Sequence, residues 1–146
     1  MKLSKKSRYG IRALIDLMNH AHGGQITLAS IAERNNISGQ YLEQVFAGLR
    51  RGGIVNSVKG PMGGYFLAES PDKITLAAVI AALEGGYRLE DEVLTVPHDF
   101  VIETLQEVVI DGINREMEIF LNSISLADLQ KNYRSRTNED ANMYFI

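Results

Sequence analysis

Four polar side chains near the middle of the chain have the types and spacing needed to bind the edges of nucleic-acid bases: Gln40, Tyr41, Glu43 and Gln44. On a helix, Gln40 and Gln44 would share one face, because residues four positions apart are neighbours there. A glutamine amide can bond adenine N6 and N7 together, and a glutamate can accept a hydrogen bond from cytosine N4. These residues therefore predict direct reading of DNA in the major groove.

The residues around this polar face predict a helix that begins after Ser38. The Ser38 hydroxyl can cap the helix by accepting from a free N–H of the first turn, and with Gly39 it would let the helix N-terminus approach a phosphate. The opposite face is apolar at the i, i+3, i+4, i+7 spacing, with Leu42, Val45, Phe46 and Leu49. A shorter predicted helix over 27–34 is separated from it only by residues 35–37. So short a turn is typical of the helix-turn-helix motif, whose second helix lies in the major groove.

A glycine-rich hairpin follows the second helix. Residues 54–58 are predicted to form a strand, 60–64 a tight turn and 65–67 the returning strand, because glycines permit the backbone conformations of tight turns. Lys59 and Gly60 would lie near the tip, where they can contact phosphate. Arg50 and Arg51 at the end of the helix, and Lys2 near the start of the chain, are further candidates for phosphate contacts. Together these elements predict a winged helix-turn-helix DNA-binding domain over residues 1–84.

The charge of the chain is divided unevenly, although the net charge is only −3. Residues 1–67 hold nine Lys and Arg against three Asp and Glu, whereas residues 68–146 hold six against fifteen. This asymmetry predicts a nucleic-acid-binding part and an acidic part with another role. A well-hydrated acidic surface is the alternative explanation for the second half.

The composition also limits the compartment and the cofactors. The 146 residues contain no cysteine, which is typical of a cytoplasmic protein and excludes every thiolate-bound metal or cluster. No apolar run of about 18 residues could cross a bilayer, so no membrane partner is expected. The basic N-terminus leads into an amphipathic helix pattern rather than into the apolar stretch of a signal peptide.

A long helix is predicted over about 99–122, after an acidic loop over 87–98. Its apolar residues cover more than one stripe, which favours burial both against its own domain and against a second subunit. Packing within one chain is the alternative. The expected fold is mainly α with a small β-wing, a winged helix-turn-helix domain plus a long dimerisation helix. The residues expected at the homodimer interface are Ile102, Leu105, Val109, Ile113, Met117 and Phe120.

The chain after the long helix is predicted to form one short last helix and then a flexible tail. Ser125 and Asp128 resemble a capping box at the start of that helix. Residues 85–130 would thus comprise the acidic loop, the long helix and the short helix, and residues 131–146 the flexible C-terminal tail. Tyr144, Phe145 and Ile146 end the tail, and they can either pack into a groove of the protein's own dimer or bind a partner that captures C-terminal carboxylates.

Several separated motifs resemble the IscR/NsrR/CymR family of bacterial repressors. They are Arg8-Tyr9-Gly10, Tyr41-Leu42-Glu43-Gln44, Leu49-Arg50, Gly60-Pro61-Met62-Gly63-Gly64-Tyr65 and Leu83-Glu84-Gly85. The resemblance implies a homodimeric winged-helix regulator that binds double-stranded DNA at an imperfect palindrome. Lys59 stands where family members commonly have arginine, which favours a phosphate contact over bidentate recognition.

The segment before the long helix departs from the cluster-sensing members of this family. Those members carry three cysteines there, whereas residues 85–98 contain none. His98 alone cannot hold a cluster, so no cofactor is expected. The chain therefore resembles most the cluster-free CymR type, which represses genes of sulfur and cysteine metabolism. That resemblance implies cysteine synthase as a partner, bound through Tyr144, Phe145 and Ile146.

Two other classes of function can be weighed against a DNA-binding regulator. An enzyme is not expected, because the sequence has no nucleophile–base pair, no HExxH motif, no paired carboxylates in a recognisable frame and no phosphate-binding loop. The alternative that remains is a protein-interaction adaptor with the same fold, which binds a metabolic enzyme through its C-terminal tail. Such an adaptor would bind DNA only weakly, and salt would abolish the binding.

Overall fold

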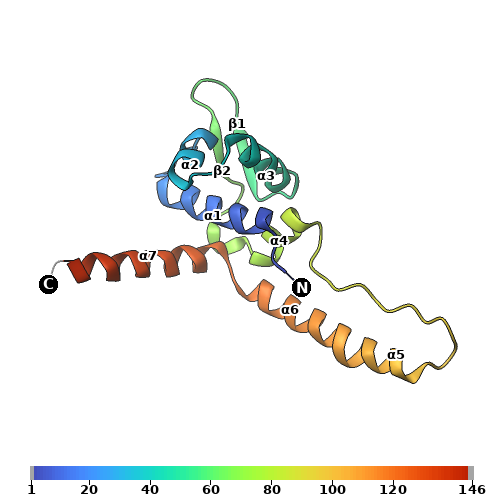
Figure 1. Ribbon diagram of the computed structural model, residues 1–146. Helices are drawn as coiled ribbons and strands as arrows, with labels where there is room; N and C mark the ends of the chain where they lie inside the picture. Colours follow the sequence, from blue (N-terminus) through green and yellow to red (C-terminus); the bar gives the residue numbers. More distant parts are fainter. Residues whose placement is uncertain (1, 145–146) are drawn as a thin grey trace.

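The computed structural model describes residues 2–144 and has a winged-helix body from which two helical arms project (Figure 1). The body contains α1 (Lys5–His20), α2 (Leu28–Asn35), α3 (Gly39–Arg51), β1 (Val55–Val58), β2 (Gly64–Leu67), η1 (Pro71–Lys73) and α4 (Leu76–Glu84). The arms contain α5 (Phe100–Thr104), the π-helix η2 (Leu105–Ile110), α6 (Asp111–Ser123) and α7 (Leu126–Tyr144). The expected mainly α fold with a small β-wing is confirmed. Among the described residues, every helix is too short or too polar to cross a bilayer.

The core of the body lies where α1, α3 and α4 pack against one another. Leu14 and Leu17 of α1 meet Phe46 of α3 and Val79 of α4 in one buried cluster. Four of the helices in the body begin at a Ser or Thr that accepts from the N–H three residues later: Ser4, Thr27, Ser38 and Thr75. Such a cap stabilises a helix by about 1 kcal/mol. The predicted cap at Ser38 is therefore present, and the helix boundaries follow from local sequence.

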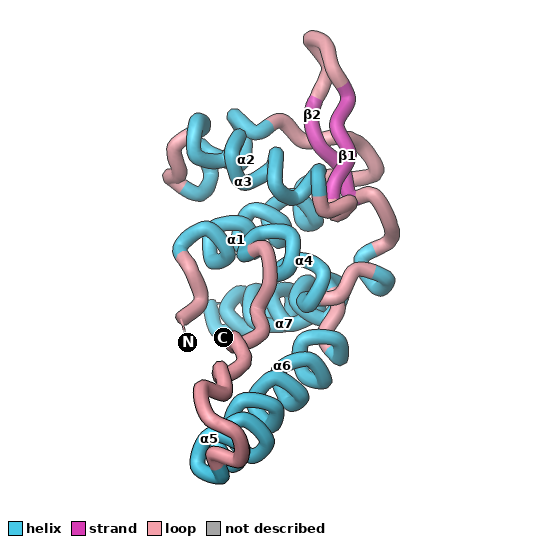
Figure 2. The backbone as a smooth tube through the Cα atoms, turned by 90° about the vertical axis from the view of Figure 1, so that its right-hand side faces the viewer, coloured by secondary structure: helices cyan, strands magenta, loops and turns pink. Residues whose placement is uncertain are grey.

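The wing is a two-stranded antiparallel hairpin in which Val55 pairs with Leu67 and Val58 with Gly64. The loop before α2 extends this sheet, because the N–H and C=O of Ile26 bond the C=O and N–H of Tyr65 at 2.9 and 2.7 Å. Figure 2 shows the hairpin standing upright from the helices. At Gly64 a Cβ atom would lie only 2.6 Å from the Ile26 carbonyl oxygen, so this close approach requires glycine. The predicted strand–turn–strand is confirmed.

The predicted long helix is present as the continuous arm α5–η2–α6, and the loop over 85–98 runs beside it (Figure 2). Two amide side chains of the arm hold that loop. Asn114 accepts from the Leu89 N–H at 2.7 Å and donates to the Leu89 carbonyl at 3.1 Å. Gln106, in the π-helix, accepts from the Glu92 N–H at 2.7 Å and donates to Asp91 at 3.0 Å. We call this pair of contacts the amide clasp, and it fixes the loop without any metal ligand.

The expectation of a short last helix followed by a flexible tail needs correction. Ser125 and Asp128 do form the capping box, with bonds of 2.8 and 3.1 Å, but α7 continues to Tyr144. Residues 131–144 contain neither glycine nor proline, so nothing in their backbone stops the helix once it has begun. The polar residues of this segment led to the prediction of a flexible tail, but in the structure they form the water-exposed surface of a helix. Phe145 and Ile146 lie outside the described residues.

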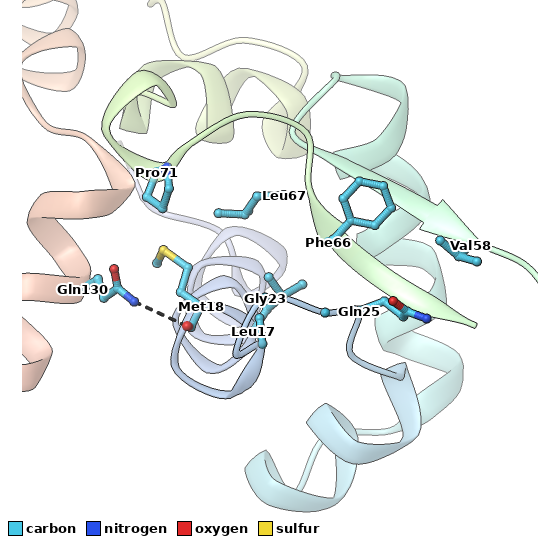
Figure 3. Close-up of a pocket in the computed structure, with 11 residues that line it drawn as sticks. Leu17, Met18, Gly23, Gln25, Val58, Phe66, Leu67, Pro71 and Gln130 are labelled. Carbon is cyan, nitrogen blue, oxygen red and sulfur yellow. Dashed lines mark hydrogen bonds between the residues drawn. The ribbon is translucent and has the colours of Figure 1, made fainter. Parts of the chain in front are cut away.

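The helix α7 is attached to the body by its N-terminal half, as far as Arg134, whose Nε donates to the Asn19 side chain at 3.4 Å. Leu126 is buried in the main core and Leu129 packs against it. The Gln130 amide donates to the Met18 carbonyl at 3.4 Å, beside the groove drawn in Figure 3. From Lys131 to Met143 every residue is exposed, and Figure 1 shows α7 leaving the body on the side opposite to α5.

An ion pair with a buried carboxylate ties α1 to the helix-turn-helix. The side chain of Asp16 is 7% exposed and receives three bonds from Arg34, Nη2 to Oδ1 at 2.6 Å, Nε to Oδ2 at 3.0 Å and Nε to Oδ1 at 3.2 Å. Asn35 donates to the same carboxylate at 2.9 Å. Burial opposes ionisation of Asp16, but the bonds from Arg34 and Asn35 outweigh it and hold its pKa below the ordinary value.

Substitution of Asp16 by asparagine should therefore destabilise the fold in a way that depends on pH. We expect Asp16→Asn to lower the free energy of unfolding at pH 7 by about 2 kcal/mol, because charge-assisted hydrogen bonds are lost. The pKa of Asp16 is lower in the folded than in the unfolded protein. The extra stability of the wild type over the variant is therefore present above the unfolded pKa, and it is lost as the pH falls below about 4. Urea unfolding at pH 7 and at pH 3 measures both values. Glu139→Gln, which neutralises an exposed carboxylate on α7, is the control. An equal loss at both pH values would contradict the assignment.

Candidate nucleic-acid interface

The N-terminal half of α3 presents polar side chains to solvent while its other face holds the core. Gln40, Glu43 and Gln44 are exposed, and the backbone at Gly39 is exposed beside them. The opposing residues Leu42, Val45, Phe46 and Leu49 are fully buried. The Ser38 hydroxyl accepts from the Tyr41 N–H at 3.3 Å, so the first turn is held in helical form. This arrangement leaves the amide side chains free to bond base edges.

Tyr41 differs from the other residues predicted on this face, because it is half-buried. Its ring meets the ring of Tyr9 from α1 edge-on, with centroids 5.9 Å apart. The Lys5 ammonium lies 5.4 Å from the centroid of the Tyr9 ring. Tyr41 therefore connects the start of α3 to α1, a tertiary contact that periodicity within α3 could not indicate.

The predicted phosphate-binding residues lie in three separate places. Lys59 and Gly60 are exposed at the turn of the wing, where Gly60 has φ +108°, a backbone conformation that favours glycine. The guanidinium of Arg50 donates to the Ser57 hydroxyl at 3.2 Å, so it links α3 to the wing, whereas Arg51 beside it is exposed. The wing turn is fixed from a second side, because the Gln25 amide donates to the Met62 carbonyl.

Lys2 lies apart from the wing, at the N-terminus of α1. It lines a concave surface together with Leu3, Ser4, Lys5, Arg8, Tyr9 and Arg12. Sequence reasoning selected Lys2 and missed the other cations of this surface. Their i, i+3, i+7 spacing from Lys5 to Arg12 is the signal that could have found them, since it places them on one face of α1.

The α5–α6 arm carries a large apolar surface that no other described part of the chain covers. Of the residues expected at the dimer interface, Leu105, Val109 and Phe120 are exposed, whereas Ile102, Ile113 and Met117 are half-buried. Further exposed apolar side chains on the arm are Phe100, Val101, Val108 and Ile119. Phe100 is 71% and Val108 67% exposed. Exposed apolar patches of this kind mark sites of protein contact.

The residues of the 85–98 loop do not fit an iron–sulfur cluster. The chain has no cysteine, and His98 is exposed, with φ +58° and its ring 6.3 Å from that of Phe100. Within residues 2–144, no three His, Asp or Glu side chains converge as metal ligands would. The side chain at the centre of the loop contact is instead Asn114, which is 1% exposed and engaged on both sides by Leu89.

A groove of about 450 Å³ lies between the wing, the end of α1 and α7. Figure 3 shows Leu17, Phe66, Leu67 and Pro71 around it, with the amides of Gln25 and Gln130 at its sides. Its lining contains no charged or nucleophilic side chain, so it offers no group for acid–base or covalent catalysis. The polar and charged groups suited to binding DNA lie instead on α3, the wing and the N-terminal half of α1.

Comparison with known proteins gives one consistent result. Residues 3–132 match the Rrf2 family, described as an iron-dependent transcriptional regulator. The chain is 38% identical to the transcriptional regulator IscR of Erwinia tasmaniensis, over 90% of this chain and 80% of that protein. Among solved structures, CymR, the global cysteine regulator of B. subtilis, superposes with a TM-score of 0.72 and 36% identity, over 90% of this chain and 98% of that one. IscR of T. potens gives a TM-score of 0.70 and 37% identity, over 91% and 88% of the two chains. Since the family match covers most of the chain, this protein belongs to the Rrf2 family of DNA-binding transcriptional regulators.

Proposed function

We propose that the protein is a homodimeric repressor, active in the cytoplasm, that reads an imperfect palindrome in DNA without an iron–sulfur cluster. The observation that carries the proposal is the orientation of α3. Its apolar face is fully buried, and Gln40, Glu43 and Gln44 project from the other face. Ser38, Gly39 and the N–H groups of the first turn approach a phosphate, while the amides bond base edges.

The homodimer is supported by the apolar surface of the arm. Phe100, Val108 and Phe120 are all more than half exposed, which is unfavourable for a lone chain in water. A symmetric pairing of two arms buries the same patch on both chains. The pairing would also fix the distance between the two copies of α3. A fixed distance is needed if both helices are to read half-sites on one face of the DNA.

The absence of cysteine supports a regulator that responds to something other than cluster status. Here the amide clasp of Asn114 and Gln106 holds the loop in which the family's cluster-sensing members are expected to carry cysteines. Because this clasp needs no metal, DNA binding by this chain should not depend on iron. The likeness to CymR, a global cysteine regulator, favours genes of sulfur and cysteine metabolism as the targets.

The proposal is tested by selection of random duplex DNA on purified protein at about 150 mM salt, with and without a metal chelator. We expect enrichment of one palindrome whose half-sites lie about one helical turn or a multiple of it apart. The chelator should leave the enrichment unchanged. Failure to enrich any sequence would overturn the proposal, and enrichment only in the absence of chelator would overturn its metal-free part.

The matched variant for this experiment is Val109→Glu. Val109 is exposed on the arm, so the single chain should fold as before, whereas a dimer would have to bury an unpaired carboxylate. We expect this variant to sediment as a monomer and to bind the selected palindrome far more weakly. A dimer that survives the substitution would place the contact elsewhere on the chain.

The separate roles of α3 and the wing give a second prediction. Gln44→Ala should cost about 1–3 kcal/mol on the selected duplex and relax the preference at one base pair, because an amide–base contact is lost. Lys59→Ala should weaken binding to all sequences alike, and it should reduce the slope of log affinity against log salt concentration by about one. Affinities measured on the selected duplex and on single-base variants, over a range of salt, separate the two outcomes. If Lys59→Ala instead removed the preference at a base pair, the wing and not α3 would be the element that reads that base.

A second candidate function, an adaptor role, rests on the geometry of α7. Its last turns lie away from the body, and Met143 is 75% exposed at their end. We propose that this end of the chain binds a metabolic enzyme, cysteine synthase being the first candidate, through Tyr144, Phe145 and Ile146. Aromatic and aliphatic side chains beyond an exposed helix suit an apolar groove on a partner protein.

Removal of residues 144–146 tests this contact. The truncated protein should lose binding to cysteine synthase, while its sedimentation as a dimer and its affinity for the selected duplex stay unchanged. Titration of the purified enzyme with labelled full-length and truncated protein measures the first effect. Equal binding of the two forms would remove the adaptor role.

A further inference from the structure

The N-terminal half of α1 carries a concentration of positive charge of which the interface described above uses only Lys2. Lys2, Lys5, Arg8 and Arg12 line one concave surface of about 760 Å³, together with Leu3, Ser4 and Tyr9. We call the surface formed by these seven residues the α1 basic groove. Residues 2–12 contain no Asp or Glu at all. The groove therefore has positive charge along its length and no acid of its own.

These cations are not neutralised elsewhere in the described part of the chain. None of the four takes part in an ion pair there, since the three pairs found join His20 and Arg34 to Asp16, and Arg88 to Glu118. One carboxylate of α1 itself, Asp16, and one that contacts α1, Glu84, are both engaged. Asp16 is held by Arg34, and Glu84 accepts from the Ser4 N–H at 3.1 Å and from the Ser7 hydroxyl at 2.6 Å. Hydrogen bonds from Ser4 and Ser7 hold the pKa of Glu84 below its ordinary value, so it remains an anion with its own donors.

The groove is continuous with the base-reading helix. The Lys5 ammonium lies over the ring of Tyr9, and Tyr9 meets Tyr41 edge-on at 5.9 Å between centroids. Tyr41 is the third residue of α3, and its N–H is bonded by the Ser38 cap. Two rings in edge-on contact thus bridge the α1 basic groove and the helix N-terminus that approaches DNA.

We propose that the α1 basic groove holds the sugar–phosphate backbone of DNA next to the bases read by α3. Lys5 and Arg12 are seven residues apart, which is about 10 Å along a helix. Cations spread over this length can each meet a different phosphate of one strand. The proposal rests on the DNA-binding role and adds to it a sequence-independent contact that sets the orientation of α3.

The test is the salt dependence of binding for the triple variant Lys5→Ala, Arg8→Ala, Arg12→Ala. Loss of three phosphate contacts should reduce the slope of log affinity against log salt by about 2.7. The reduction should be the same on the selected operator and on an unrelated duplex, and base preference should not change. These side chains are free of ion pairs in the described structure, so the variant should fold; its thermal unfolding is compared with that of the wild type.

Two further variants control for net charge and for side-chain shape. Lys73→Ala, Lys131→Ala, Arg136→Ala removes the same charge from exposed positions outside the groove and should change the slope much less. Arg8→Lys with Arg12→Lys keeps the charge and should retain the wild-type slope, since a phosphate contact needs charge more than a planar fork.

The outcomes also separate this proposal from the proposed function. An unchanged slope in the triple variant, or an equal loss in the charge control, would overturn the α1 groove while leaving sequence-specific binding intact. A reduced slope on an unrelated duplex, in a protein that enriches no operator, would support the groove and overturn specific recognition. Wild-type protein that binds no duplex at all would overturn both.

Discussion

The close approach of three helices at Gly10 is the constraint on which the rest of the molecule depends. A Cβ atom at Gly10 would lie 2.6 Å from Leu83 Cδ1 and 3.3 Å from Val45 Cγ1, so a larger residue where α1, α3 and α4 meet would have to displace the buried Leu83 side chain. The same crossing brings Ser7 to Glu84 and Tyr9 to Tyr41. The orientation of the polar face of α3 is thus set by packing on its opposite face, since interiors are close-packed and resist displacement.

The two ends of the long arm make different contacts with the rest of the chain. Near the body, Leu121 packs with Ala77 and Ile80 of α4, which connects the arm to the winged helix. Farther out, the amide clasp holds the 85–98 loop, and the exposed apolar side chains begin to dominate. A buried amide such as Asn114 is costly unless its donor and acceptor are both satisfied, and here the backbone of Leu89 satisfies both. The loop is therefore ordered by a local, metal-independent contact.

The features predicted successfully from the sequence are those encoded by neighbouring residues. The caps, the apolar spacing of α3 and the glycines of the wing each act within a few positions, and each appears where predicted. The length of α7 was missed because its polar residues suit both a mobile tail and a hydrated helix, and only the anchoring of Leu126 and Gln130 on the body distinguishes them. The link from Arg50 to Ser57 and the contact of Tyr9 with Tyr41 depend on how separate elements meet, which no single window of sequence contains.

The uneven charge of the chain acquires a physical meaning once the elements are placed. Nine of the fifteen Lys and Arg residues precede residue 68, mostly at α1, the end of α3 and the wing turn, whereas the loop and arm carry a series of carboxylates including Asp91, Glu92, Glu103 and Glu107. In the field of a duplex the first group is attracted and the second repelled, so the molecule is oriented before any base contact forms. Under the proposed function, such steering would favour approaches in which α3 faces the duplex, and the exposed amides of α3 would then discriminate among sites.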